Sequence, residues 1–105
     1  IALSVEEPPL VVGNTIRFTA NITEDESKLY NILVVFKDEN NNELGTALST
    51  DGIAILDIDT LSVGEHTITA TVIESELYNS VSDDITCTVI DHNYDLSINV
   101  NIVGV

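Results

Sequence analysis

One acidic turn in this sequence has the residue types that could bind a metal ion. Asp38, Asn40 and Asn42 alternate along the segment Asp38–Glu43, and carboxylate and amide oxygens are the ligands that calcium prefers. The expected strand order puts this turn at the same pole as Asp91, which could add a further ligand. The turn lacks the glycine and the distal glutamate of an EF-hand loop. Calcium binding by these four side chains is one hypothesis, and a solvated hairpin tip in a protein without a cofactor is the simpler interpretation.

The single cysteine and a histidine are the other candidates for chemistry. Cys87 shares its strand parity with Ile85 and Val89, so we expect it to be a small buried side chain. A lone cysteine has no internal disulfide partner. A pair of Cys87 and His66 could form if their strands are neighbours, but a nucleophile that faces the core is out of reach of a substrate. We therefore predict that this chain has no catalytic residue and is not an enzyme.

Charge and composition exclude several classes of partner. The chain has 18 acidic and 3 basic side chains, with a net charge of −15, so nucleic acid and anionic membranes would repel it. Its longest apolar run, Ile32–Phe36, is far shorter than the roughly 20 residues of a membrane span. Isoleucine, valine and threonine make up 36 of the 105 residues, and β-branched side chains favour strands. We predict one all-β domain.

Short apolar segments separated by turn signals predict a seven-stranded antiparallel immunoglobulin-like β-sandwich. Phe18 and Phe36 have inward parities, and Asp51-Gly52 is expected to form a tight turn. The expected strands are Ala2–Glu6 (with an edge piece, Leu10–Val12), Thr15–Thr23, Ile32–Lys37, Leu44–Ser49, Ile53–Asp59, His66–Ile73 and Ile85–Ile90.

The last part of the sequence does not fit a single domain. We expect residues 1–91 to form the sandwich. Residues 92–105 would be a linker and the opening strand of a following repeat, or a terminal strand that extends the sheet. Leu96-Ser97-Ile98 echoes Leu3-Ser4-Val5, 93 positions earlier. The first residues already have a strand pattern, so we expect the chain to be a piece of a longer protein.

Two similar loops suggest a surface for a partner. The segment Glu26–Asn31 resembles Glu74–Asn79, and in an immunoglobulin-like sandwich both loops would lie at one pole. Tyr30 and Tyr78 are therefore candidates for a partner-binding spot. Asn21 starts the sequon Asn21-Ile22-Thr23 and faces outward by parity, which makes it a glycosylation candidate if the protein is exported.

From Val35 to Asp91 the sequence resembles a bacterial-type immunoglobulin-like repeat of prokaryotic surface proteins. Five spaced elements carry the resemblance, in order: Val34–Asp38, Leu44–Ala47, Asp51–Ala54, Leu61–Val72 and Tyr78–Ser82. The sequence departs from the family at Val72, where the family has an aromatic residue, and at Ile73-Glu74, where it has glycine and aspartate. The family has such repeats in tandem in adhesin-like proteins of bacteria and methanogenic archaea, and no catalytic motif. His66 matches a structural histidine of the family.

The resemblance implies an extracellular, cell-surface module that acts as a structural spacer and projects a distal binding region. Its expected partners are neighbouring repeats of the same chain and a host or microbial cell surface, without nucleic acid and without membrane insertion. Two alternatives stay open. The module could itself bind a cell-surface or glycan partner through the pole of Tyr30 and Tyr78, or it could be an accessory module of a secreted enzyme.

Overall fold

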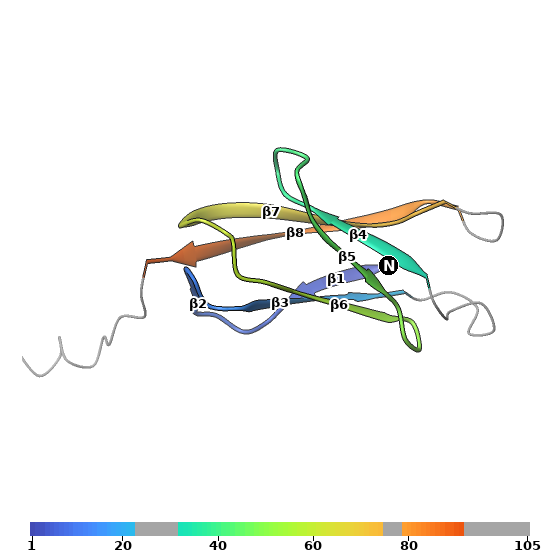
Figure 1. Cartoon of the computed structure of the whole chain (residues 1–105), viewed down its shortest axis with the longest axis horizontal. Helices are drawn as coiled ribbons and strands as arrows, with labels where there is room; N and C mark the ends of the chain where they lie inside the picture. Colours follow the sequence, from blue (N-terminus) through green and yellow to red (C-terminus); the bar gives the residue numbers. More distant parts are fainter. Residues whose placement is uncertain (23–31, 75–78, 92–105) are drawn as a thin grey trace, which may run out of the picture.

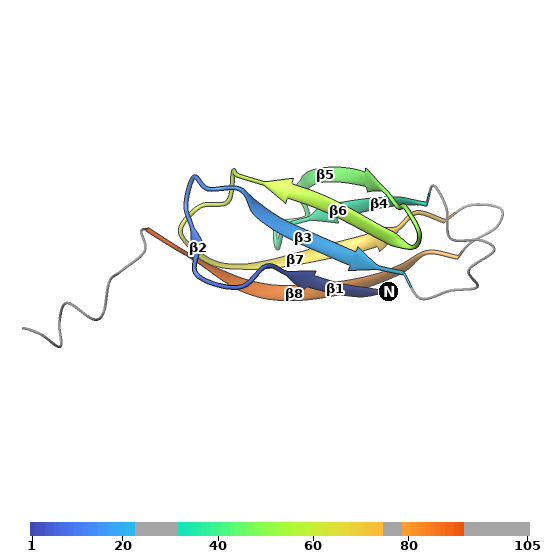
Figure 2. The same cartoon turned by 90° about the horizontal axis from the view of Figure 1, so that it is seen from below.

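The computed structural model describes residues 1–22, 32–74 and 79–91 as two β-sheets packed face to face. The three-stranded sheet has the order β1-β3-β6, and the five-stranded sheet has the order β2-β8-β7-β4-β5. Figure 1 shows the two layers, and Figure 2 views the three-stranded sheet from its own side. The strands are β1 (Ala2–Val5), β2 (Leu10–Val11), β3 (Ile16–Asn21), β4 (Leu33–Lys37), β5 (Glu43–Leu48), β6 (Ile53–Ile58), β7 (Gly64–Val72) and β8 (Val81–Ile90).

The all-β sandwich is confirmed, but the expected number of strands is wrong. Eight strands form where seven were predicted, because the break at Glu7–Pro9 separates the first expected strand into two that belong to different sheets. Proline has no N–H to donate to a ladder, so the first strand ends before it. The wholly antiparallel arrangement is also wrong, since β2 pairs with β8 in parallel, Leu10 opposite Val89.

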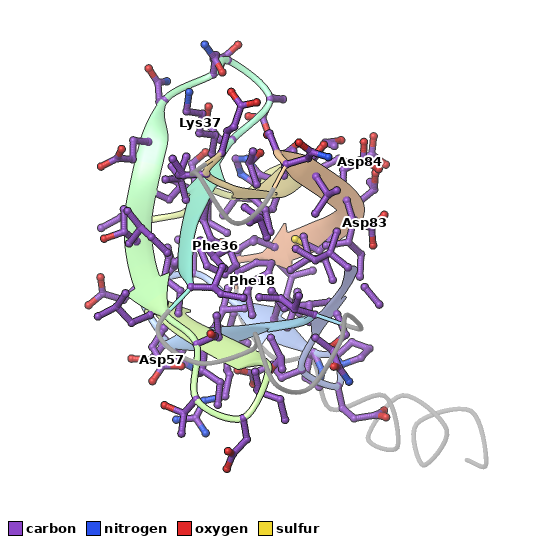
Figure 3. All side chains as sticks on the ribbon, turned by 90° about the vertical axis from the view of Figure 1, so that its right-hand side faces the viewer. Phe18, Phe36, Lys37, Asp57, Asp83 and Asp84 are labelled. Carbon is purple, nitrogen blue, oxygen red and sulfur yellow. The ribbon has the colours of Figure 1, made fainter. Side chains whose placement is uncertain are left out.

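Alternation along the strands builds the core between the sheets. Phe18 of β3 and Phe36 of β4 are fully buried, as their parity predicted, and Figure 3 shows both rings in the interior between the two layers. Cys87 is also buried among apolar side chains. The strand β4 has neighbours on both sides and buries both Val34 and Val35, which explains why its sequence is apolar at consecutive positions.

Two local features fix how the sheets connect. Asp51 and Gly52 both have positive φ, at 52° and 80°, in the tight turn that the sequence predicted between β5 and β6. At Gly45 an added Cβ would lie 3.0 Å from the Leu56 side chain, so glycine allows β5 to lie close to β6 of the other sheet. Among the residues that the structure describes, no helix has the length and hydropathy to span a bilayer.

A carboxylate closes the edge of the sandwich at β1. The backbone N–H of Leu3 points away from β3 and donates to Asp83 Oδ2 of β8, at 2.8 Å. Asp83 belongs to the opposite sheet, so this bond links the two layers. It also satisfies a donor that an edge strand would otherwise offer to another chain.

Replacing Asp83 by alanine is expected to lower the free energy of unfolding by about 1–2 kcal/mol, because the Leu3 N–H loses a charged acceptor. Urea denaturation followed by circular dichroism measures the change. Asp84→Ala is the matched control, since Asp84 is exposed on the same strand and no change beyond about 0.5 kcal/mol is expected there. Equal effects of the two substitutions would contradict the role of Asp83 at this edge.

Candidate functional site

The hairpin turn between β4 and β5 is held together by the carboxylate of Asp38. Oδ1 of Asp38 accepts the backbone N–H groups of Asn40 and Asn42, each at 2.9 Å, and Oδ2 accepts the Asn42 side-chain amide at 3.3 Å. The backbone of Asn41 takes a positive φ of 65°, a conformation that asparagine tolerates better than most residues. Asp38, Asn40 and Asn42, whose alternation suggested calcium ligands, therefore form hydrogen bonds with one another inside the turn.

The electrostatics of the turn agree with this geometry. The backbone N–H of Asn42, above all, holds the pKa of Asp38 below its usual value, and the N–H of Asn40 acts in the same direction. Within residues 1–22, 32–74 and 79–91, no group of three or more histidine, cysteine, aspartate or glutamate side chains could hold a metal ion. Asp91 follows the end of β8 and is exposed. Calcium binding at this turn stays a hypothesis.

Millimolar calcium is expected to leave the melting temperature of this chain unchanged relative to EDTA, because both oxygens of Asp38 already accept hydrogen bonds inside the turn. A thermal melt in the two conditions measures this. The control is Asp38→Asn, which keeps one side-chain oxygen for the turn and lowers the charge available to a cation. A calcium-dependent rise in the parent that Asp38→Asn abolishes would establish a site at the turn and contradict this expectation.

A second cluster ties the same turn to the beginning of β7. Glu39 Oε1 accepts the backbone N–H of Thr67 at 3.0 Å, and Glu39 Oε2 lies 3.1 Å from Nδ1 of His66. The other ring nitrogen, Nε2, lies 2.8 Å from the carbonyl oxygen of Ser62. The pKa of Glu39 is lowered by its own backbone N–H and by that of Thr67. The cluster joins the hairpin tip to the corner before β7.

Cys87 and His66 lie on neighbouring strands, and they face each other in the ladder between β7 and β8. The geometry does not activate the thiol. Both ring nitrogens of His66 are directed at Glu39 and at the Ser62 carbonyl. Burial raises the pKa of Cys87, and the nearby carboxylate of Glu39 raises it further. A thiolate nucleophile needs the opposite setting, with positive charge and exposure.

The turn predicts a specific dependence on pH. Because the folded-state pKa of Asp38 lies below its ordinary value, its contribution to stability is full above the ordinary aspartate pKa of about 3.9 and is lost as the pH falls through the folded-state pKa. We expect Asp38→Asn to melt at a lower temperature than the parent at about pH 6–7, and the gap to close as the pH falls below the ordinary aspartate pKa and through the lowered folded-state pKa. Melts at several pH values measure it, and a gap that stays constant into acid would contradict the role of the charge.

The remaining candidates lie far from one another or outside the described residues. Asn21 ends β3 and is exposed on the outer face of the three-stranded sheet, opposite Ala2 and Ile53. The outward direction that its parity predicted is confirmed, and glycosylation stays a prediction. Tyr30 and Tyr78 lie outside the described residues, as do residues 92–105. The sequence analysis did not identify Glu39 as a contact of His66. The two residues are 27 positions apart, and the local pattern around Glu39 does not predict a contact over that separation.

Comparisons with known proteins bear on the fold alone. No protein-family model and no curated protein sequence matches the chain. Among solved structures, the chain is similar to CopC from Methylosinus trichosporium OB3b, with a TM-score of 0.52 and 14% sequence identity. The match covers 90% of this chain and 94% of that one. At this identity the similarity supports an all-β sandwich architecture and nothing finer.

Proposed function

We propose that this chain is a non-catalytic structural repeat of a cell-surface, adhesin-like protein, in which it acts as an extracellular spacer that projects a distal binding region. The observation that carries the proposal is the position of the first and last strands. The strand β1 begins toward one pole of the sandwich, and β8 ends at the opposite pole (Figures 1 and 2). Copies joined in sequence would therefore extend end to end, as a stalk requires.

The order of the strands supports an immunoglobulin-like topology for the module. The sheet β1-β3-β6 faces the run β8-β7-β4-β5, and these correspond to strands A-B-E and G-F-C-C′ of an immunoglobulin-like domain. The short β2 adds to the second sheet beside β8. The sequence elements that resemble the prokaryotic repeat family fall on β4, β5, β6 and β7, with the last one spanning the beginning of β8.

The surroundings of the reactive side chains support a role without catalysis. The thiol of Cys87 is buried and its pKa is raised, and His66 is engaged by Glu39 and Ser62. Cys87 packs in the core, and His66 links the hairpin turn to the corner before β7. A net charge of −15 would keep neighbouring stalks apart and in solution. The partners that we propose are neighbouring repeats of the same chain, with a cation such as calcium as a bridge at their acidic junctions.

Display on a cell surface tests the spacer role directly. Arrays of one, two and four copies would carry a tip with a known ligand, and a flexible glycine–serine linker of equal residue number would replace the array in the control. We expect the reach of the tip to increase with copy number and to exceed that of the linker, because a folded array is stiffer than a random coil. Cell or glycan binding by the array without its tip would contradict the proposal and favour an adhesive module.

A further inference from the structure

Three exposed aliphatic side chains form a row across the outer face of the five-stranded sheet. Leu48 of β5 is 60% exposed, Leu33 of β4 is 40% exposed and Ile73, directly after β7, is 44% exposed. Leu33 lies opposite Leu48 in the ladder, and its carbonyl accepts the N–H of Ile73 at 3.2 Å. A contiguous group of exposed aliphatic side chains on a chain with a net charge of −15 is a candidate interaction site.

The row ends at β5, which is an edge of the five-stranded sheet among the residues that the structure describes. A register irregularity and the charged Glu43 mark the beginning of β5. The remaining stretch, Gly45–Leu48, includes no charged side chain and no proline, two of the devices that protect an edge strand. Two other edges are protected, because Asp83 caps β1 and β2 has only two residues. An edge of this kind can accept a further strand, which would continue both the ladder and the apolar row.

The fourth edge, β6, has no such row. Ile55 is 45% exposed there, but it lies opposite Thr19, and Ile53 lies opposite Asn21. One step further along, Asp57 of β6 forms an ion pair with Arg17 of β3, with Nε to Oδ1 at 2.9 Å. The two exposed isoleucines of β6, Ile53 and Ile55, therefore face polar residues of the neighbouring strand and form no apolar row across the sheet. This makes β6 a matched control for β5.

The sequence contains a segment suited to the β5 edge. Leu96–Val105 has no charged residue, and its apolar side chains at 96, 98, 100 and 102 alternate with polar ones. This is the period of a strand with one apolar face. The segment has ten residues, enough to cover the six residues of β5. It lies outside the described residues.

The positions of the poles favour a second copy of the chain as the source of this strand. The row lies at the pole where β7 ends and β8 begins, since Val72 pairs with Val81. The chain leaves β8 at the other pole, after ten strand residues, or about 30 Å. When copies are arranged end to end, the segment that follows Asp91 in one copy reaches the pole of the next copy that carries the row.

We propose that residues 96–105 of one copy add as a β-strand to the edge of β5 in a second copy. Leu96, Ile98, Val100 and Ile102 would form the apolar face of the added strand, and one of them would lie beside Leu48 and extend the row of Leu48, Leu33 and Ile73 by one position. The docking would make a directional, head-to-tail contact between copies, which can propagate into a chain of molecules. This inference goes beyond the spacer role and does not depend on it, because it needs only the edge and the segment.

Sedimentation velocity of the full 105-residue chain, over a series of concentrations, tests the contact. The parent is expected to associate. Leu48→Lys puts a charge on the β5 edge, and Ile98→Lys puts a charge on the segment. Each substitution is expected to raise the dissociation constant of the association at least about tenfold. Ile55→Lys is expected to associate like the parent. Circular dichroism confirms that each variant is folded.

Mixing the two weakened variants gives the sharpest result. Ile98→Lys keeps an intact β5 edge and Leu48→Lys keeps an intact segment, so an equimolar mixture is expected to form a one-to-one dimer and no longer chain. A parent that stays monomeric at every concentration would overturn the proposal, and so would a monomeric mixture. Association of Ile98→Lys like the parent would indicate a face-to-face contact of two rows and would also overturn it. None of these results would contradict the spacer role.

Discussion

Phe36→Ala is expected to lower the free energy of unfolding by about 3–5 kcal/mol. Phe36 is fully buried in β4, and Phe18 of the facing sheet is buried with it. Alanine would leave a cavity between two sheets that ladders hold in place, so the surroundings can collapse only in part. At roughly 4–8 °C for each kcal/mol in a domain of this size, the melting temperature should fall by about 12 °C or more. Chemical and thermal denaturation followed by circular dichroism measure both quantities.

Ile55→Ala is the matched control for the cavity. Ile55 is a large aliphatic residue on a strand, but it is 45% exposed on the outer face of β6. Its loss is expected to change stability by no more than about 1 kcal/mol. Similar losses in the free energy of unfolding for Phe36→Ala and Ile55→Ala would contradict the burial of Phe36 in a packed interior between the sheets.

Ser49→Ala is expected to lower the free energy of unfolding by about 1–3 kcal/mol, although it removes a single oxygen atom. The Oγ of Ser49 accepts the backbone N–H of Ile32 at 3.0 Å, and the Ser49 N–H donates to the Ile32 carbonyl at 2.9 Å. Ile32 and Ser49 are both buried. Without the hydroxyl, the Ile32 N–H would be left in the core with no water to replace its acceptor.

The control for this prediction is Ser82→Ala, because Ser82 is exposed on β8. We expect a change within about 0.5 kcal/mol there. Hydrogen exchange of the Ile32 amide adds a local measurement, since this amide should lose protection in Ser49→Ala beyond the loss caused by global destabilisation. Unchanged exchange at Ile32 would contradict the assignment of Ser49 Oγ as its acceptor.

Much of the sandwich is predictable from the sequence, because each strand has one buried face with period two. Phe18, Ile68 and Val89 lie in the core where alternation puts them, and the Asp51-Gly52 turn follows from the freedom of glycine at positive φ. These features depend only on neighbouring residues, so a local pattern is enough to predict them.

The wrong and missing predictions concern contacts between strands that are far apart in the sequence, which a local pattern does not predict. The pairing of β2 with β8 depends on where the chain crosses after Pro9, and the crossing puts Leu10 beside Val89 of the other sheet. The bond from Leu3 to Asp83 joins residues 80 positions apart. The last strand was expected to begin at Ile85, but β8 begins at Val81 and includes Asp83. The sequence pattern did not indicate that Asp83 accepts a hydrogen bond from β1.

The hairpin turn shows a different limit. Asp38, Asn40 and Asn42 have oxygen atoms of the kind that bind calcium. Residue type alone does not distinguish a metal ligand from a side chain that forms hydrogen bonds within its own turn. The structure directs both oxygens of Asp38 to donors within four residues. The missing information was the direction of the side chain, which depends on the backbone of the turn, with Asn41 at positive φ.

Small-angle X-ray scattering of two copies joined in sequence tests the central claim most directly, which is that the domain is a unit built to extend end to end. Because β1 begins toward one pole and β8 ends at the other, we predict a maximum dimension close to twice that of a single copy. A single copy under the same conditions is the reference, and both proteins carry Leu48→Lys so that association through the β5 edge does not lengthen either particle. A compact particle only slightly longer than one copy, with the two sandwiches side by side, would contradict the account.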